Sequence, residues 1–351
     1  MSEPGLNELV RAAEELMVGS DRDLLVFSGS IDDDNSDAFI SSILACEHRR
    51  KKVVFFLCTY GGDPHAAYRM ARVLRRCYPE DIRILIGSQC KSAGTLIALC
   101  ADSLGFSDFG ELGPLDTQLS RPDEVLQRAS GLEVFSTLQY LTDHAFSCFE
   151  QNMLSIISKS GQTVSTRLAS EIASKLATGL LKPITAQLDP YRIRIAQRGL
   201  DVTKRYGIRI ANVKNVRSDA DTLVDHLVKD YPTHAFVIDK EEAAILFQNV
   251  DGFSGSEQAV FDQLKTRLVR PSDDPFIVNF ASVIATQASK KQQEKQNAET
   301  GLRNRHTPPS SEGQPVEATP RRKSNGRQTT ASDTRESGTP PPAESTGTRF
   351  Q

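Results

Sequence analysis

Two short turns in the first third of the chain contain residue types that could carry out chemistry. The segment YGGDP at 60–64 follows the apolar run at 53–58 after one threonine, and CKSAG at 90–94 comes after the strand-like run at 82–86. Each turn therefore lies between a predicted strand and a predicted helix, where exposed backbone N–H groups can bind a developing negative charge. A serine beside such amides has suitable surroundings for nucleophilic attack on a carbonyl.

Both turns also admit a purely structural interpretation. Ser92 is a preferred residue type for a helix N-cap, and Gly61 and Gly62 suit a tight turn with positive φ. The functional alternative is that glycine lets the backbone approach a substrate with no side chain between them. The residues alone leave both alternatives open.

The elements that would position these turns alternate between strand and helix patterns. We expect strands over 24–30, 53–58 and 82–86, and helices over 36–46, 65–77 and 93–101. This order predicts an α/β fold with a parallel sheet and right-handed crossovers. The run at 53–58 is apolar without a break, as in strands buried on both faces of a sheet.

The remaining chain divides by pattern. Helices are predicted over 132–158, 164–178 and 188–206, with Gly161, Gly179 and Pro183 as breakers in the loops between them, and one more helix over 256–269. The predicted organisation is an N-terminal helical segment (1–23), an α/β core (24–122), a helical insertion (123–215), a closing α/β segment (216–270) and a polar, disordered tail (288–351).

Composition excludes several classes of function. Among 351 residues, 42 Lys and Arg oppose 45 Asp and Glu, a net charge of −3 that favours neither nucleic acid nor an anionic membrane as a partner. No apolar run approaches the ~20 residues of a membrane span, and no signal peptide is visible.

Six cysteines without a C-x-x-C pair are typical of buried free thiols in a reducing compartment. The acidic run at 32–35 precedes a helix, as capping residues do, and lacks the spacing of a calcium loop. We therefore expect a cytoplasmic protein with no cofactor and no metal.

Three longer motifs carry a family resemblance. They are SAGTLIAL at 92–99 with Ala101-Asp102, GPLDTQ at 113–118, and HAFVIDKEEA at 234–243. With these motifs the chain resembles the serine dehydrogenase proteinase family, relatives of the Clp and signal peptide peptidase A proteases, over about residues 24–245. The resemblance implies a Clp/crotonase-like parallel-sheet core with a helical insertion.

The resemblance also implies an activity and a set of site residues. It implies an ATP-independent serine peptidase that acts on a peptide or protein substrate and forms a homo-oligomer. Ser92 would be the nucleophile, and the N–H groups of Gly62, beside Gly61, and of Ala93 would bind the oxyanion. The family's triad order gives Ser92, Asp116 and His234 as the catalytic residues.

The identity of the general base stays open. Asp116 lies 24 residues after Ser92, where the Clp proteases carry their histidine, so the order of acid and base is swapped here and Asp116 could instead order a loop. A lysine base is the other option. Lys91 points about 100° away from its neighbour around a helix start, whereas three lysines of the helical insertion could reach the site or be solvated: Lys159, Lys175 and Lys182.

Two other classes of function compete with the peptidase. One is a non-catalytic scaffold or interaction protein with a Clp-like fold. The other is a crotonase-type acyl-CoA enzyme, which would use the same two backbone amides for a thioester oxyanion. The serine at position 92 favours the peptidase, because crotonase chemistry needs no nucleophile there.

Overall fold

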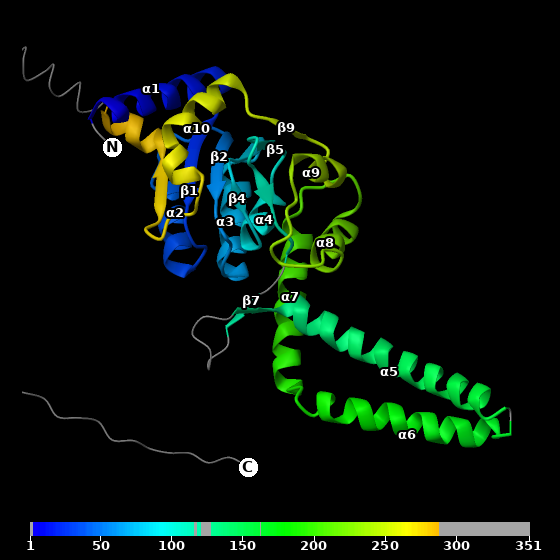
Figure 1. Ribbon diagram of the computed structural model, residues 1–351. Coiled ribbons are helices and arrows are strands. Elements are labelled where there is room, and N and C mark those ends of the chain that lie inside the picture. Colours follow the sequence, from blue (N-terminus) through cyan, green and yellow to red (C-terminus); the bar gives the residue numbers. More distant parts are fainter. Residues whose placement is uncertain (1–2, 116–117, 121–127, 162, 288–351) are drawn as a thin grey trace, which may run out of the picture. The chain divides into compact units, whose positions relative to one another are not determined.

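A six-stranded sheet forms the centre of the computed structural model, which describes residues 3–115, 118–120, 128–161 and 163–287 (Figure 1). Its strands are β1 (Asp23–Ser28), β2 (Lys52–Cys58), β3 (Asp81–Ile86), β5 (Ser103–Phe106), β9 (Val250–Gly252) and β10 (Phe276–Asn279). Their order is β10-β1-β2-β3-β5-β9, and every neighbouring pair is parallel except β1 with β10. The α/β prediction, with its mostly parallel sheet, is confirmed.

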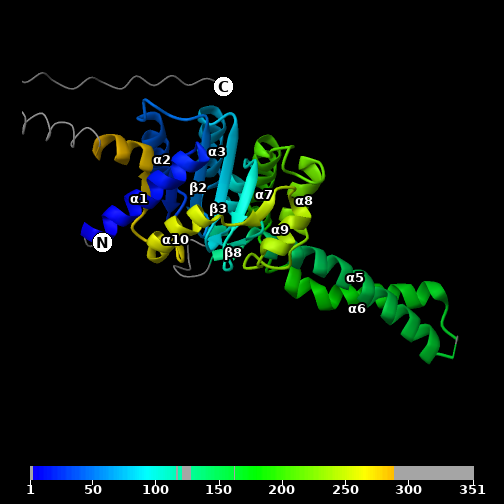
Figure 2. The same cartoon turned by 90° about the horizontal axis from the view of Figure 1, so that it is seen from above.

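Helices cover both faces of this sheet, as Figure 2 shows. One face packs against α2 (Asp33–Leu44), α3 (Pro64–Cys77), α4 (Ala93–Ala98) and α8 (Ala220–Lys229), and the other against α1 (Glu3–Ser20) and α10 (Gly255–Leu268). Alternate residues of a strand point to opposite faces. Phe55 and Leu57 of β2 accordingly lie in the first core, whereas Val54 and Phe56 lie in the second. All four are fully buried, which explains the unbroken apolar run.

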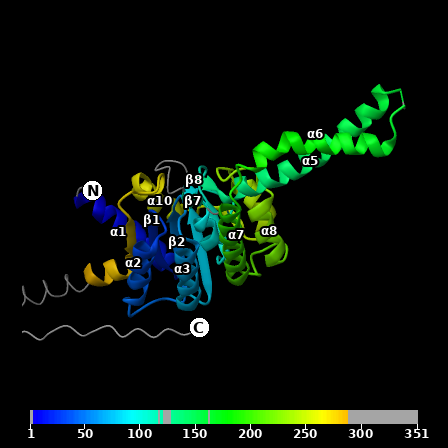
Figure 3. The same ribbon diagram turned by 90° about the horizontal axis from the view of Figure 1, so that it is seen from below.

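The predicted helical insertion is a pair of long helices followed by a third. Helices α5 (Gly131–Lys159) and α6 (Thr166–Thr185) lie side by side in all three views, and α7 (Pro190–Ile210) leads back along α3 to the core (Figure 3). The predicted loop at Gly179 and Pro183 is wrong, because both residues lie inside α6. Proline at 183 removes one hydrogen bond, to the carbonyl four residues earlier. That carbonyl belongs to exposed Gly179, which water can reach.

The described chain also contains a final helical stretch at 280–287 and several short elements. They are β4 (Gln89–Cys90) paired with β6 (Glu111–Leu112), β7 (Gln118–Ser120) paired with β8 (Arg128–Ser130), and α9 (Lys240–Leu246) in the closing segment. The predicted tail at 288–351 lies outside the described residues. The described helices include none long and apolar enough to cross a membrane.

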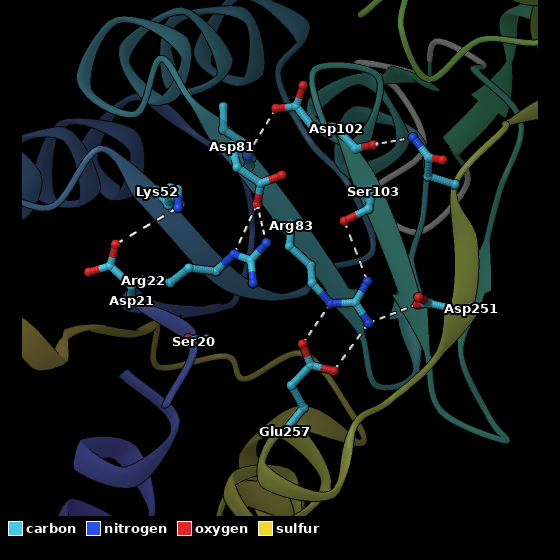
Figure 4. A network of polar contacts seen from close by, with 12 residues as sticks. Ser20, Asp21, Arg22, Lys52, Asp81, Arg83, Asp102, Ser103, Asp251 and Glu257 are labelled. Carbon is cyan, nitrogen blue, oxygen red and sulfur yellow. Dashed lines mark hydrogen bonds and ion pairs between the residues drawn. The ribbon is translucent and has the colours of Figure 1, made fainter. Parts of the chain in front are cut away.

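A buried ion network joins the sheet to α10 (Figure 4). Arg83 of β3 is 8% exposed and donates to Glu257 Oε1 at 2.6 Å and Oε2 at 3.1 Å. A third bond goes to Asp251 Oδ1 at 2.8 Å. Glu257 also accepts from the backbone N–H of Ser254 at 2.7 Å, which closes a capping box at the start of α10.

Two further predictions concern residue types: capping by the acidic run at 32–35 is confirmed, and burial of the cysteines is confirmed for four of the six. Asp32 caps α2 by accepting from the N–H of Asn35 at 2.9 Å, and Asp33 and Asp34 lie in the first turn of that helix. All six cysteines are free thiols, and four of them are buried. Burial raises the pKa of both Cys58 and Cys100 to about 12, so these thiols stay protonated at neutral pH.

Candidate active site

Ser92 has a strained backbone at the start of α4. It occupies the N-cap position with φ 50° and ψ −110°. Among the described residues, only one other non-glycine residue, Asp21, has positive φ. Such a conformation costs on the order of 1–3 kcal/mol and persists only where the surroundings enforce it. A strained serine between a strand and a helix is also the arrangement that presents a nucleophile in α/β-hydrolases.

The side chain of Ser92 does not cap its helix. Eight described helices have an assigned N-cap residue, and at seven of them the side chain accepts a hydrogen bond from the first turn. Ser92 is the exception among these eight. Ser165, the N-cap of α6, shows the ordinary case, with φ −64° and a bond from the N–H of Leu168 at 3.3 Å. The capping interpretation of Ser92 is therefore wrong.

The double-glycine turn lies directly against Ser92. A Cβ atom added to Gly61 would lie 2.9 Å from the Cβ of Ser92 and 3.0 Å from the carbonyl oxygen of Lys91, so a side chain would displace the serine. Gly61 also has φ 104°, a conformation that favours glycine. The close approach of the two turns thus requires glycine at position 61.

The same turn is fixed to the chain after β1. The N–H of Ile31 donates to Gly61 O at 3.0 Å, and Ile31 O accepts from the N–H of Asp63 at 2.7 Å. Between these bonds lies Gly62, where an added Cβ would meet Ile31 O at 2.0 Å. Asp63 then caps α3 through His65 N–H at 3.0 Å. Hydrogen bonds on both sides therefore fix the backbone at Gly62, although Gly62 itself is exposed to solvent.

The two turns meet because β2 and β3 are neighbouring parallel strands. Beyond the strand ends, Thr59 and Cys90 continue the pairing, with bonds of 2.8 Å from Thr59 N–H to Gln89 O and 3.0 Å from Lys91 N–H to Thr59 O. Gly94 allows α4 to start in this space, since its Cβ would lie 2.5 Å from Thr59 Cγ2. Ala93 is the first residue of α4, so its N–H has no partner within the helix. The geometry therefore suits an oxyanion site next to partly exposed Ser92.

Lys91 is a buried anchor. It is 7% exposed, and its Nζ lies 3.2 Å from Glu111 Oε1. It also donates to the carbonyls of Leu112 at 3.1 Å and Phe236 at 3.3 Å. These contacts agree with the prediction that Lys91 does not serve as the base for Ser92.

Sequence analysis missed Lys91 as an anchor, together with Thr95. The Oγ1 of Thr95 donates to Gly113 O at 2.7 Å, and an added Cβ at Gly113 would lie 2.6 Å from Lys91 Cδ. The sequence contained one signal for the contact between Thr95 and Gly113, since a polar threonine follows a glycine at the start of an otherwise apolar helix.

Of the predicted acid and base, the structure describes only His234. Asp116 lies outside the described residues, directly after Leu115, which is buried and bonded through its N–H to Leu227 O at 2.9 Å. His234 is partly exposed in the segment between α8 and α9. That segment is brought beside the Ser92 turn, because Phe236 O accepts from Lys91 and Ile238 pairs with Leu112.

Two other histidines and the three candidate lysines lie in surroundings of their own. His65 Nδ1 lies 2.9 Å from the hydroxyl of Tyr206, and His226 Nδ1 lies 2.7 Å from Asp230 Oδ2. The three lysines predicted either to reach the site or to be solvated are exposed on α5 and α6: Lys159, Lys175 and Lys182. The described residues form no cluster of three His, Cys, Asp or Glu side chains that could hold a metal ion.

The chain is only weakly similar to known proteins. No protein-family model matches the chain. The uncharacterized protein MJ0137 of Methanocaldococcus jannaschii is 32% identical over 88 residues, which cover 25% of this chain and 30% of that protein.

Two solved structures are of variants of the membrane-bound stomatin-specific protease 1510-N. They have TM-scores of 0.27 and 0.26 at 17% and 18% identity. The first covers 42% of this chain and 67% of that one; the second, with a bound substrate peptide, covers 45% and 69%. Likeness at this level adds nothing to the geometry around Ser92.

Proposed function

We propose that the chain is a serine peptidase in which Ser92 is the nucleophile. The supporting observation is the strained conformation of Ser92, whose side chain leaves α4 uncapped while its backbone lies against the double-glycine turn. An unfavourable conformation costs stability, and this serine does not cap its helix, so we attribute its conformation to reactivity.

The proposed reaction uses the two turns together. The Oγ of Ser92 attacks the carbonyl carbon of a peptide bond, and its proton passes to the general base. The N–H groups of Gly62 and Ala93 stabilise the oxyanion. The base then protonates the departing amine, and water hydrolyses the resulting acyl-enzyme ester. We assign the base to His234, with Asp116 as its carboxylate, because the chain carrying His234 is bonded to Lys91, next to Ser92.

The finer description follows the family resemblance. We include in the proposal an ATP-independent peptidase of the serine dehydrogenase proteinase type, with a homo-oligomeric assembly and a cytoplasmic location. A scaffold role and acyl-CoA chemistry are the competing functions, and both leave Ser92 without a covalent task.

A fluorophosphonate probe tests the nucleophile. We expect covalent labelling of the full-length wild-type chain and none of Ser92→Ala, whose thermal stability should stay close to wild type because no capping bond is lost. Ser165→Ala is the matched control, since it removes a serine that does cap. It should keep its labelling and lose about 1 kcal/mol of stability. Labelling that survives in Ser92→Ala, or its absence from the wild type, would refute the proposal.

A further inference from the structure

A cavity of about 670 Å³ lies between the C-terminal half of α3 and the chain that ends α7. Figure 3 shows these two helices side by side. Six basic side chains line the cavity: Arg69, Arg72, Arg75 and Arg76 from α3, Arg209 from α7, and Lys214 beyond it. The whole protein has a net charge of −3, so this concentration of positive charge is local.

Only part of this charge is neutralised within the protein. Arg69 pairs with Asp33 at 2.8 Å and with Asp37 at 3.0 Å, and Arg75 pairs with Asp102 at 2.8 Å. Four cations remain, and the guanidinium of Arg72 lies 5.7 Å from the ring centre of Tyr68. The C-terminal ends of α3 and α7 contribute about half a negative charge each. Six cations against these three carboxylates and about one negative charge from the two helix ends leave a surplus of about two positive charges.

The floor of the cavity is a fixed network. Asp102 accepts from the N–H of Ile82 at 2.9 Å and from Asn212 Nδ2 at 2.7 Å, besides its pair with Arg75. Asn212 is 9% exposed and also donates to Ala101 O at 3.1 Å. The walls are different, since Arg72, Arg76, Arg209 and Lys214 are exposed. The exposed cationic side chains above this fixed network are free to turn toward a bound anion.

We propose that this cavity binds a small ligand with a diphosphate group. Its volume lies within the roughly 300–1,000 Å³ of small-molecule sites. Five of its six cations are arginines, whose planar, forked donors match phosphate oxygens in pairs. A diphosphate brings about three negative charges, enough to neutralise this surplus of about two. The lining contains none of the residues that we propose to act with Ser92.

Calorimetric titration of the full-length protein with inorganic pyrophosphate and with ADP tests this site. We expect saturable binding of at least one of them at low salt. Equal affinities would identify a bare diphosphate as sufficient, and tighter binding of ADP would identify a nucleoside diphosphate. The variant Arg76→Ala/Lys214→Ala removes one exposed cation from each wall and should weaken binding at least ten-fold.

The control variant Arg167→Ala/Arg194→Ala removes the same charge from exposed positions outside the cavity. It should change the affinity less than two-fold. The proposal is overturned if neither ligand binds, if both variants weaken binding equally, or if the cavity variant binds like the wild type. Preference for an oligoglutamate peptide over pyrophosphate would also overturn it.

Discussion

Removing the carboxylate of Glu257 should destabilise the protein strongly. In Glu257→Ala, Arg83 loses two of its bonds while 8% exposed, and the capping box of α10 opens. Breaking a buried pair from one side costs about 3–5 kcal/mol, because the remaining charge is uncompensated. Asp251 still contacts Arg83, so we expect the lower end, about 3 kcal/mol. With an unfolding entropy of about 2.1 cal/mol/K per residue over the roughly 275 described residues, that corresponds to a fall in Tm of about 5 °C.

Urea unfolding followed by circular dichroism measures this loss. Asp251→Ala is the matched control, since its side chain is 65% exposed and its pair with Arg83 should contribute no more than about 1 kcal/mol. The double variant Arg83→Met/Glu257→Leu removes both buried charges and should be more stable than Glu257→Ala. A loss below about 1 kcal/mol in Glu257→Ala, or a double variant less stable than the single one, would refute this reasoning.

The same pair predicts a pH dependence. Burial alone would raise the pKa of Glu257, but the hydrogen bond from Arg83 and the bond from the Ser254 N–H outweigh it, so the pKa is lowered. The unfolded chain therefore binds the proton first as the pH falls. The stabilisation by Glu257 should be fully present above pH ~4.3, the ordinary glutamate value. It should disappear as the pH falls through the lower folded value, where wild type and Glu257→Gln should converge in urea unfolding.

Three further outcomes are expected. Gly61→Ala should abolish fluorophosphonate labelling while the chain still folds, because the new methyl group displaces Ser92; unchanged labelling would contradict the close approach of the turns. In native protein at pH 8, Ellman's reagent should react with Cys77 and Cys148 and spare the four buried thiols until denaturant is added; rapid reaction of all six would show that the core opens. His234→Ala should lower kcat/KM for a peptide substrate by several orders of magnitude, whereas a mild effect would favour a lysine as the base.

The sequence was sufficient where burial alone determines structure. The run at 53–58 is apolar throughout and the run at 82–86 is apolar except for Arg83, and both were predicted as strands within one residue of β2 and β3. The strand β10 was missed because four residues, Phe276–Asn279, give little pattern. Its partner β1 lies about 250 residues earlier, so only the folded chain shows the pairing.

The sequence was enough to predict which two turns form the candidate site, but it could not predict the backbone conformation of Ser92. Neighbouring parallel strands end at one edge of a sheet, so the two turns could be expected to meet. The positive φ of Ser92 could not be expected, because serine favours an ordinary cap and nothing local requires the strained form. That conformation depends on distant residues, such as the Gly61 turn and the Gly113 loop that is bonded to Thr95.

Lys91 explains how this strain can be maintained. A strained residue persists only when its neighbours fix the chain on both sides. On one side of Ser92, the buried ammonium of Lys91 binds Glu111 and two carbonyls. On the other side, Gly94 packs against Thr59. Since one of those carbonyls belongs to Phe236, the contact that fixes the serine turn also fixes the chain two residues after His234. The proposed nucleophile and the proposed base are therefore positioned through one lysine, which cannot itself be the base while it makes these bonds.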